Sequence, residues 1–463
     1  RISRNTRAEF TFGGLNINGR RKKSIRHPEH KWHDLNRLLF DEKLGIPVIS
    51  ETHMSAEQVD EIRESHLNRR MEIYHTSCPD NPSTKGVAII INKELLSVQD
   101  IEEMCLIPGR ALMLKIPWHM KRVITVLGVY APADSGEENA KFWDELTEMW
   151  LQKPNIAVPD IVGGDFNLTP EMIDRLPHRC DHPRALEALA RFKTVLGLGD
   201  GFTATYPDEK AYTYTSTRQP PTFARLDYIL VSPELQKTCR DWKISDAAGN
   251  LSDHKLTTVR IRAPGSPYIG KGCYAIPEFV VQDDRYIADV IRVGSALEAH
   301  IRPDGSAEET LQLEYNSFKE YMRDEGRRHA KESKGATHQK KCKLAAERDQ
   351  LLSEHDPPGS ETVGTDGIPG PDHETVIRDK LASVEKKISE LVSLERDRAR
   401  TATRVGFHGQ TERLTKFSVN LHKDKTPRDT LDMLRMTDTV PEQSCRRSDE
   451  MASLAKGYYE DLQ

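Results

Sequence analysis

Short apolar runs alternate with amphipathic stretches from about Phe10 to Arg262. Several runs hold three or more consecutive apolar residues, which is typical of strands covered on both faces. The predicted strands are 11–17, 47–51, 86–91, 111–116, 123–130, 161–163, 211–214, 226–231 and 255–261, and the predicted helices are 30–42, 55–69, 137–152 and 182–196. Strands interleaved with helices over this length predict one α/β domain in which sheets lie inside helical layers.

The character of the chain changes after Arg262. Proline and glycine residues cluster just beyond it, which is typical of a domain boundary, so we predict a domain over 1–262 and a linker over 263–309. The remainder, 310–463, is predicted as a charged, mostly helical region. Its two helices cover about 310–354 and 374–403, and the Pro- and Gly-rich segment 356–373 is predicted as a disordered loop.

The second of these helices carries a heptad pattern. Apolar residues step by alternating four and three positions, at Ile377, Leu381, Val384, Ile388 and Leu391. The pattern fits an antiparallel hairpin that packs on a neighbouring part of the chain, and it also fits an intermolecular coiled coil. We favour the first interpretation, and the oligomeric state stays open.

The composition and net charge of the chain limit the classes of protein to which it can belong. The chain has 463 residues, 30% of them charged, and a net charge of -5, so no overall basicity indicates a high-affinity, sequence-independent DNA binder. A nuclease whose contacts are confined to one cleft remains compatible with this charge. The seven cysteines are scattered without zinc-knuckle or redox spacing, which favours a reducing compartment. No signal peptide or membrane-length apolar run is evident, so we expect a soluble, intracellular protein, and the first residue, Arg1, suggests a fragment or processed product.

Polar segments mark the ends of five predicted strands. They are Leu15-Asn16-Ile17-Asn18-Gly19, Ser50-Glu51-Thr52-His53, Gly163-Gly164-Asp165-Phe166-Asn167, Arg225-Leu226-Asp227-Tyr228 and Ser252-Asp253-His254. Hydrolysis of a phosphodiester needs a divalent cation with oxygen ligands, an aligned water, a proton acceptor and donors for the equatorial charge. Each segment alone also fits a turn, a helix cap or a surface ion pair. Together, in this order, they predict a metal-dependent phosphodiesterase.

The ordered set resembles the endonuclease/exonuclease/phosphatase superfamily, whose segments look like W-N-V-N-G, Q-E-T, Y-A-P, G-D-F-N, R-I-D-Y and S-D-H. This chain offers all six, with Tyr130-Ala131-Pro132 as the third, over about Phe10 to Arg262. The resemblance implies a four-layer α/β sandwich, with two packed sheets flanked by helices. Leu15 and Ser50 depart from the pattern, and we expect them to weaken support of the site rather than its chemistry.

The resemblance also implies roles for individual residues. Glu51 is similar to the principal metal ligand, with Asn16 helping to order the site and Asp253 holding the metal or orienting His254. Mg²⁺ is the implied cofactor, with Mn²⁺ as a possible substitute. The positions similar to catalytic residues are Asp165, which orients or deprotonates water, Asn167 and Tyr130, which contact the phosphate, Asp227, which orients His254 or holds metal, and His254, which stabilises the phosphoryl oxygens.

A third set is expected to contact the substrate. It comprises Asn18, Thr213, Arg225, Arg20 and Arg21. The two arginines open the basic run at 20–23, which fits phosphate contacts and equally a solvated loop.

Three features are similar to the endonuclease domain of a non-LTR (LINE-type) retrotransposon polyprotein. The first is Lys31-Trp32 with the leucines that follow it, and the second is the amino-acid sequence of 86–89 and 128–132. The third is a tail at 411–417 and 455–459, which resembles the connector before a reverse transcriptase. No aromatic-x-Asp-Asp motif occurs, so a reverse transcriptase is missing from this chain. The resemblance implies a nuclear enzyme that nicks one strand of target DNA and leaves a 3′ hydroxyl, with element RNA as a further partner through the missing remainder.

Two other hypotheses stay open. The same chemistry serves a cellular phosphodiesterase, such as an abasic-site repair endonuclease, an RNA deadenylase or a phosphoinositide phosphatase. The long helical tail argues against the first, and the absence of additional basic motifs argues against the last. From another class, the chain could be a catalytically dead nucleic-acid-binding or helical interaction module.

Overall fold

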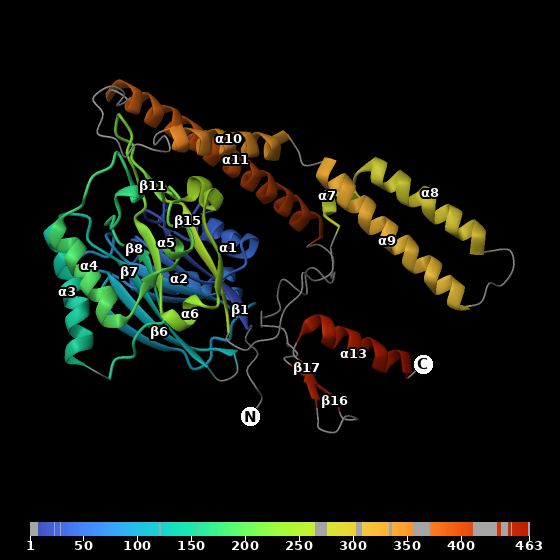
Figure 1. The fold of residues 1–463 in the computed structure, drawn as a ribbon, viewed down its shortest axis with the longest axis horizontal. Coiled ribbons are helices and arrows are strands. Elements are labelled where there is room, and N and C mark those ends of the chain that lie inside the picture. The colour runs from blue at the N-terminus through green and yellow to red at the C-terminus, as the bar shows by residue number, and fades with distance from the viewer. Residues whose placement is uncertain are drawn as a thin grey trace. The chain divides into compact units, whose positions relative to one another are not determined.

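A computed structural model describes residues 8–22, 24–27, 29–119, 122–153, 155–263, 276–301, 308–332, 336–354, 371–410, 433–436, 443–445 and 447–461. Two six-stranded sheets form the centre of the N-terminal part (Figure 1). The first has the order β14 (Cys239–Ser245), β15 (Leu256–Arg262), β1 (Glu9–Asn16), β2 (Leu44–Ser50), β4 (Val87–Asn92) and β3 (Met71–Thr76). The second has the order β10 (Gly199–Asp200), β13 (Asp227–Val231), β8 (Ile161–Asp165), β7 (Val123–Tyr130), β6 (Ala111–Pro117) and β5 (Glu102–Ile107).

Alternating side chains build three hydrophobic layers. In β8, Ile161 belongs to the core between the sheets, whereas the next residue, Val162, packs outward under the helices of the second sheet. In β2, Val48 and Ile49 divide in the same way. The first sheet is covered by α1 (Lys31–Asp41) and α2 (Ala56–Glu64), and the second by α3 (Gly136–Gln152) and α4 (Pro183–Leu196). The predicted four-layer α/β sandwich is therefore confirmed.

The helix ends follow local sequence signals. Helix α4 begins with Pro183 in its first turn and ends at Gly197, whose φ of 63° is the left-handed conformation that glycine adopts most easily. The helix predicted over 55–69 is divided, because Ser65 is extended and its hydroxyl accepts a hydrogen bond from the amide of Leu67. A separate 3₁₀ helix, η1 (His66–Arg69), follows.

Short elements complete the sandwich domain. They are η3 (Met172–Asp174), α5 (Gly201–Thr205), α6 (Pro233–Gln236), η4 (Asp246–Leu251) and a small sheet of β11 (Tyr214–Thr215), β12 (Phe223–Ala224) and β9 (Arg175–Leu176). The strand predicted at 211–214 is mostly wrong, since only its last residue lies in β11. Strands β3, β5 and β14 were not predicted.

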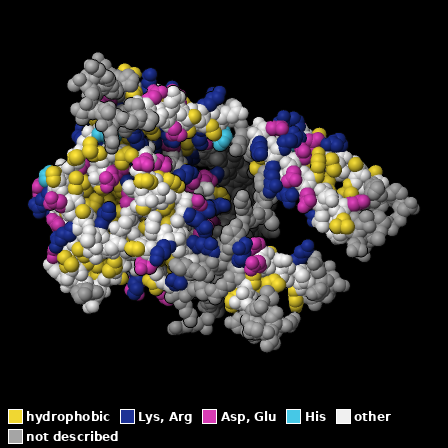
Figure 2. All heavy atoms as spheres, viewed as in Figure 1, with side chains coloured by type: hydrophobic (Ala, Val, Ile, Leu, Met, Phe, Trp, Pro, Cys, Tyr) yellow, Lys and Arg dark blue, Asp and Glu magenta, His cyan; other side chains and the backbone are white. Residues whose placement is uncertain are grey.

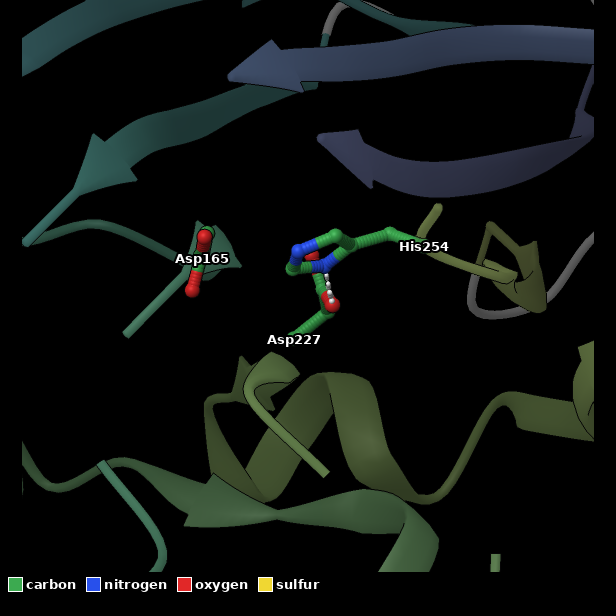
Figure 3. A group of neighbouring side chains, drawn as sticks. All are labelled: Asp165, Asp227 and His254. Carbon is green, nitrogen blue, oxygen red and sulfur yellow. Dashed lines mark hydrogen bonds and ion pairs between the residues drawn. The ribbon is translucent and has the colours of Figure 1, made fainter. Parts of the chain in front are cut away.

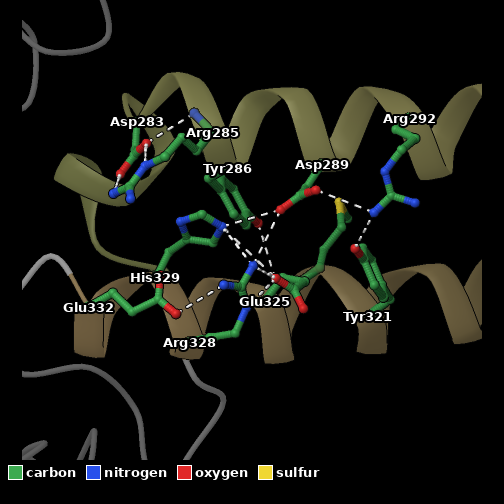
Figure 4. Close-up of polar contacts among 11 residues, drawn as sticks. Asp283, Arg285, Tyr286, Asp289, Arg292, Tyr321, Glu325, Arg328, His329 and Glu332 are labelled. Carbon is green, nitrogen blue, oxygen red and sulfur yellow. Dashed lines mark hydrogen bonds and ion pairs between the residues drawn. The ribbon is translucent and has the colours of Figure 1, made fainter.

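A second compact unit contains the described residues of 267–347 and 432–463. Its helices are α7 (Glu278–Val281), α8 (Asp284–Ile301), α9 (Glu308–Glu332) and α13 (Ser448–Asp461), and β16 (Leu434–Met436) pairs with β17 (Gln443–Cys445). Figure 4 shows α8 and α9 side by side, joined by polar contacts such as Tyr286 Oη to Met322 O at 3.1 Å. The segment predicted as a linker, 263–309, therefore contains the whole of α8.

Helix α11 (Pro371–Gln410) and the last residues of α10 (Ala336–Glu354) belong to the same compact unit as the sandwich. The heptad positions Ile377, Leu381, Val384 and Ile388 are buried, and α11 packs on η4. This arrangement supports the interpretation that the heptad residues pack against another part of the same chain. Most of the loop predicted at 356–373 and all of 411–417 lie outside the described residues, and 455–459 falls in α13.

Charge is mixed over the surface. Figure 2 shows Lys and Arg side chains interspersed with Asp and Glu over the visible face, in keeping with the small net charge. Among the described residues, no helix has the length and apolar character needed to cross a membrane.

Candidate active site

Polar side chains from both sheets meet where several strands end. Asn16 ends β1, Glu51 follows β2, and Asp165 ends β8. Asp227 begins β13, which runs antiparallel to β8, and its Cα pairs with that of Asp165. The first and second sheets thus present their polar ends at one place, although the residues are far apart in the sequence.

Asn16 links the two sheets through its buried amide. Its Nδ2 donates to Glu51 Oε1 and to Asp165 Oδ2, both at 2.8 Å. Its Oδ1 accepts from the backbone amide of Asn18 at 2.9 Å. This side chain therefore fixes two carboxylates and the turn that follows β1.

Asp227 and His254 form a buried dyad (Figure 3). The imidazole Nδ1–H donates to Asp227 Oδ2 at 2.7 Å. Burial lowers the pKa of His254, but the charge and hydrogen bond of Asp227 outweigh burial and raise it to about 10. The imidazole is therefore cationic at neutral pH and suited to stabilise anionic oxygens.

Asp165 lies beside this dyad and is completely enclosed. Burial and the neighbouring charge of Asp227 raise the pKa of Asp165 to about 7, against the lowering effect of His254 and Asn16. A carboxyl group that titrates near neutral pH is matched to accept a proton from water.

The segment Ser252-Asp253-His254, just before β15, supplies the remaining polar side chains of the site. Asp253 Oδ2 accepts from Asn18 Nδ2 at 3.3 Å. The hydroxyl of Ser252 donates to the carbonyl of Asn16 and accepts from the amide of His254 at 2.9 Å. These bonds tie the Ser-Asp-His segment to the turn after β1.

Several residues of the site have left-handed backbone conformations. The φ angles are 44° at Asn18, 52° at Glu51, 50° at His53 and 48° at Asn167. Such conformations are uncommon outside glycine and cluster at functional sites. At Asn167 the strain is offset by bonds from its amide to Asp165 Oδ1 and from its Nδ2 to Ala131 O, both 3.0 Å long.

The donor set is suited to a metal ion. An oxygen of Asp165, an oxygen of Asp227 and a ring nitrogen of His254 lie within 4.8 Å of one another, and because the imidazole is cationic the two carboxylates are the candidate metal ligands of this group. Asp227 Oδ1 is buried without a hydrogen-bond partner, which is costly for a carboxylate unless a cation or water satisfies it. With Glu51 and Asn16 adjacent, the available donors are mostly oxygens, the preferred ligands of hard divalent cations.

Tyr130 lies beside Glu51. Its hydroxyl hydrogen-bonds Glu51, and burial together with the charges of Glu51 and Asp165 raises its pKa further above the ordinary value. The Arg110 guanidinium lies 4.8 Å from the ring centroid. The hydroxyl therefore stays protonated and able to donate.

Two residues expected to contact substrate have other partners. Thr213 is fully buried, and its Oγ1 accepts from the amides of Leu226 and Asp227 at 2.9 and 3.2 Å, so it positions the start of β13. Arg225 is also buried and donates to both carboxylate oxygens of Asp174 and to Asp200. These contacts occupy the guanidinium of Arg225 within the protein.

We expect Arg225→Ala to lower the free energy of unfolding by about 3–5 kcal/mol, because it leaves the buried Asp174 and the partly buried Asp200 carboxylates without their partner. All five tryptophans lie between Trp32 and Trp242, so urea denaturation followed by tryptophan fluorescence reports on the sandwich. The control is Arg37→Ala, which removes an exposed pair with Asp41 worth about 0.3–0.5 kcal/mol. Equal losses in the two variants would contradict this assignment.

The basic run at 20–23 is only partly free for substrate. Arg20 is half-buried, and burial lowers its pKa. Arg21 donates to the carbonyl of Asn250 at 2.7 Å, and Lys22 pairs with Glu29 at 3.4 Å.

Three neighbours of the site were not predicted. Lys31 donates to the carbonyls of Ile17 and Asn18, and burial lowers its pKa to about 8. The His53 Nε2 lies 3.6 Å from Glu51 Oε2, and the Tyr214 ring lies 5.0 Å from the imidazole of His254. His53 and Tyr214 lie two residues or fewer from motif positions, which is the signal that could have found them.

Residues 32–254 match the model of the Endonuclease/Exonuclease/phosphatase family. This part of the chain belongs to that family, and the recognition made from the ordered motifs is confirmed. The chain therefore carries a hydrolytic enzyme domain.

One curated relative is the Transposon TX1 uncharacterized 149 kDa protein of Xenopus laevis, 31% identical over 166 residues. The match covers 35% of this chain and 12% of the relative, so the chain spans a small part of that protein. Similar solved structures include an AP endonuclease from Archaeoglobus fulgidus, with 21% identity, a TM-score of 0.43 and coverage of 54% of this chain and 98% of that one. Another is the endonuclease domain of TRAS1, a telomere-specific non-LTR retrotransposon, with 16% identity, a TM-score of 0.39 and coverage of 55% and 98%. Both structures concern the fold alone.

Proposed function

We propose that this chain is a Mg²⁺-dependent DNA endonuclease of a non-LTR retrotransposon, which nicks one strand and leaves a 3′ hydroxyl. The observation that carries the proposal is the convergence of Asn16, Glu51, Asp165, Asp227 and His254 at one end of the two sheets. These groups supply what phosphodiester hydrolysis requires, namely carboxylates for a hard cation, a proton acceptor and a cationic donor.

Each group has a role that its contacts support. Glu51, with Asn16 and one of the aspartates, would hold Mg²⁺, which supplies Lewis-acid stabilisation of the phosphoryl oxygens when bound. Asp165 accepts the proton of the attacking water, since its pKa lies near 7. The His254 imidazolium and the Tyr130 hydroxyl donate to the phosphoryl oxygens, and Asn167 and Asn18 contact the flanking phosphate.

A mobile-element origin is supported by the similarity to the Transposon TX1 protein. It is also supported by the resemblance of the sequences around Lys31 and at 128–132 to those of retroelement endonucleases. With that origin we place the enzyme in the nucleus, acting on a target-site duplex, with element RNA as a partner of the remainder of the polyprotein. The mixed surface charge favours DNA binding confined to the active site.

The test is relaxation of supercoiled plasmid by the full chain. We expect nicked circles with Mg²⁺, none with EDTA, and extension of the nick by a DNA polymerase, which requires a 3′ hydroxyl. Asp165→Ala should reduce the rate by about 100-fold or more, because it removes the proton acceptor. The matched control is Asp208→Ala, an exposed aspartate of the same domain.

Other outcomes would change the proposal. No relaxation by the wild type would refute the endonuclease activity. Release of AMP from poly(A), or of phosphate from inositol phosphates, without plasmid nicking would favour a cellular phosphodiesterase instead.

A further inference from the structure

Helix α11 lies against the segment that carries two of the proposed site residues. This segment, 246–255, comprises η4 and the Ser252-Asp253-His254 motif. The helix lies more than 100 residues beyond the family match, which ends at 254, since α11 begins at Pro371. Its polar contacts with the segment reach both backbone and side-chain groups, and they are additional to the apolar seam described above.

Arg396 of α11 caps the first part of the segment. Its two terminal nitrogens donate to the carbonyls of Ala248 at 2.8 Å and Ala247 at 2.5 Å. Backbone carbonyls in a short 3₁₀ turn have few partners of their own, so a charged donor that reaches two of them fixes the turn strongly.

Two serines of α11 hold the middle of the segment. Ser393 Oγ accepts from the backbone amide of Asn250 at 3.0 Å, and Ser389 Oγ donates to Asn250 Oδ1 at 3.1 Å. Beside them, Gly249 has a φ of 50°, and a Cβ built on it would lie 3.0 Å from Val392 Cγ1 and 3.1 Å from Ser393 Oγ. A side chain at this position would therefore be strained by the positive φ and would require Val392 and Ser393 to shift by a few tenths of an ångström.

Charged groups hold the end of the segment. Lys255, which directly follows His254, donates to Glu385 Oε1 of α11 at 2.6 Å and lies 3.5 Å from Asp246 Oδ1. Arg348, from the end of α10, lies 3.5 Å from Asp246 Oδ2. The two ends of the segment are thus joined to each other and to the helices.

The opposite side of the segment faces the site. Asn250 O accepts from Arg21, Asp253 accepts from Asn18, and His254 donates to Asp227. The segment is consequently held between α11 on one side and the proposed catalytic groups on the other.

We propose that α11 is a positioning element of the active site. Its residues Arg396, Ser393 and Glu385 hold the segment 246–255. This contact keeps Asp253 beside Asn18 and keeps His254 beside Asp227. This inference rests on the proposed function. It adds to the active site a helix that lies outside residues 32–254, the part that matches the family model. Its physical basis is that a misplacement of about 1 Å at a reacting group can cost about 100-fold in rate.

The test compares variants of the full chain. We expect Arg396→Ala to lower kcat for plasmid nicking by about 10- to 100-fold with little change in KM, and Ser393→Ala to lower it less. Arg396→Lys should recover part of the loss, because an ammonium can still reach one carbonyl. The controls are Ser383→Ala and Lys387→Ala, which alter exposed side chains of the same helix.

Hydrogen exchange of the metal-free protein provides a second readout. In Arg396→Ala we expect faster exchange of peptides that cover 246–255 and unchanged exchange in β8, because the helix braces this segment locally. Unchanged kcat and unchanged exchange at 246–255 would overturn the inference, and so would faster exchange over the whole sandwich. An inactive wild type would contradict the proposed function, while the exchange result would still decide whether α11 holds the segment.

Discussion

Replacement of Glu51 by glutamine is expected to reduce the nicking rate by at least about 100-fold at saturating DNA, because a cation that supplies several kcal/mol of transition-state stabilisation would lose a charged ligand. Glutamine keeps the size of the side chain and can still accept from Asn16 Nδ2, which lies 2.8 Å from Glu51 Oε1. The substitution therefore removes the negative charge of the side chain and weakens its binding of the metal ion, while its size is kept. Nicking should be partly restored by raising the Mg²⁺ or Mn²⁺ concentration.

Two measurements separate metal binding from folding. Isothermal titration of the protein with Mn²⁺ should show weaker binding in Glu51→Gln than in the wild type, and thermal unfolding should be little changed. Glu61→Gln, an exposed glutamate on α2, is the matched control and should behave like the wild type. Wild-type metal binding in Glu51→Gln, with or without loss of activity, would remove Glu51 from the metal site.

The central strands could be predicted from the sequence, whereas the edge strands could not. Strands such as β4, Val-Ala-Ile-Ile-Ile-Asn, are buried along their whole length and therefore read as continuous apolar runs. Strand β5 begins Glu-Glu and is exposed over most of its length, and β14 contains Arg-Asp and Lys. Both lie at sheet edges, where one side is open and polar residues are favoured. Their composition therefore resembles that of loops.

The location of the site could be predicted from the strand ends, but the direction of each side chain could not. Arg225 and Asp227 stand two residues apart in one motif, yet Arg225 bonds Asp174, which lies 51 residues away, while Asp227 bonds His254. No local pattern reveals which carboxylate a buried guanidinium will meet. Likewise, Arg396 reaches the carbonyl of Ala247 across 149 residues, so the contact of α11 with the site depends on tertiary packing alone.

Removal of the Asp227–His254 dyad provides the second large effect. We expect His254→Ala to reduce kcat by about 100- to 10,000-fold, because a buried cationic donor to the phosphoryl oxygens is lost. Asp227→Asn should give a loss of similar size. Asparagine keeps the shape but removes the charge that holds the imidazole cationic through the 2.7 Å hydrogen bond.

The double variant shows whether Asp227 acts through His254. If orienting and charging the imidazole is its role, then Asp227→Asn should cost little more once His254 is already alanine, since residues that act as a unit are strongly non-additive. Single-turnover nicking at saturating DNA is the measurement, and His27→Ala, at an exposed position, is the matched control. Losses that multiply would contradict this role.

A multiplicative result would instead assign Asp227 to the cation. Its Oδ1 is buried and has no hydrogen-bond partner, so the carboxylate has one oxygen for His254 and one for a metal ion. Titration with Mn²⁺ distinguishes the two uses, because His254→Ala should leave metal affinity unchanged. Weaker Mn²⁺ binding in Asp227→Asn, together with a strongly non-additive rate loss, would mean that this one carboxylate serves both the imidazole and the cation. That dual use would account for a buried carboxylate with an open oxygen at the junction of the two sheets.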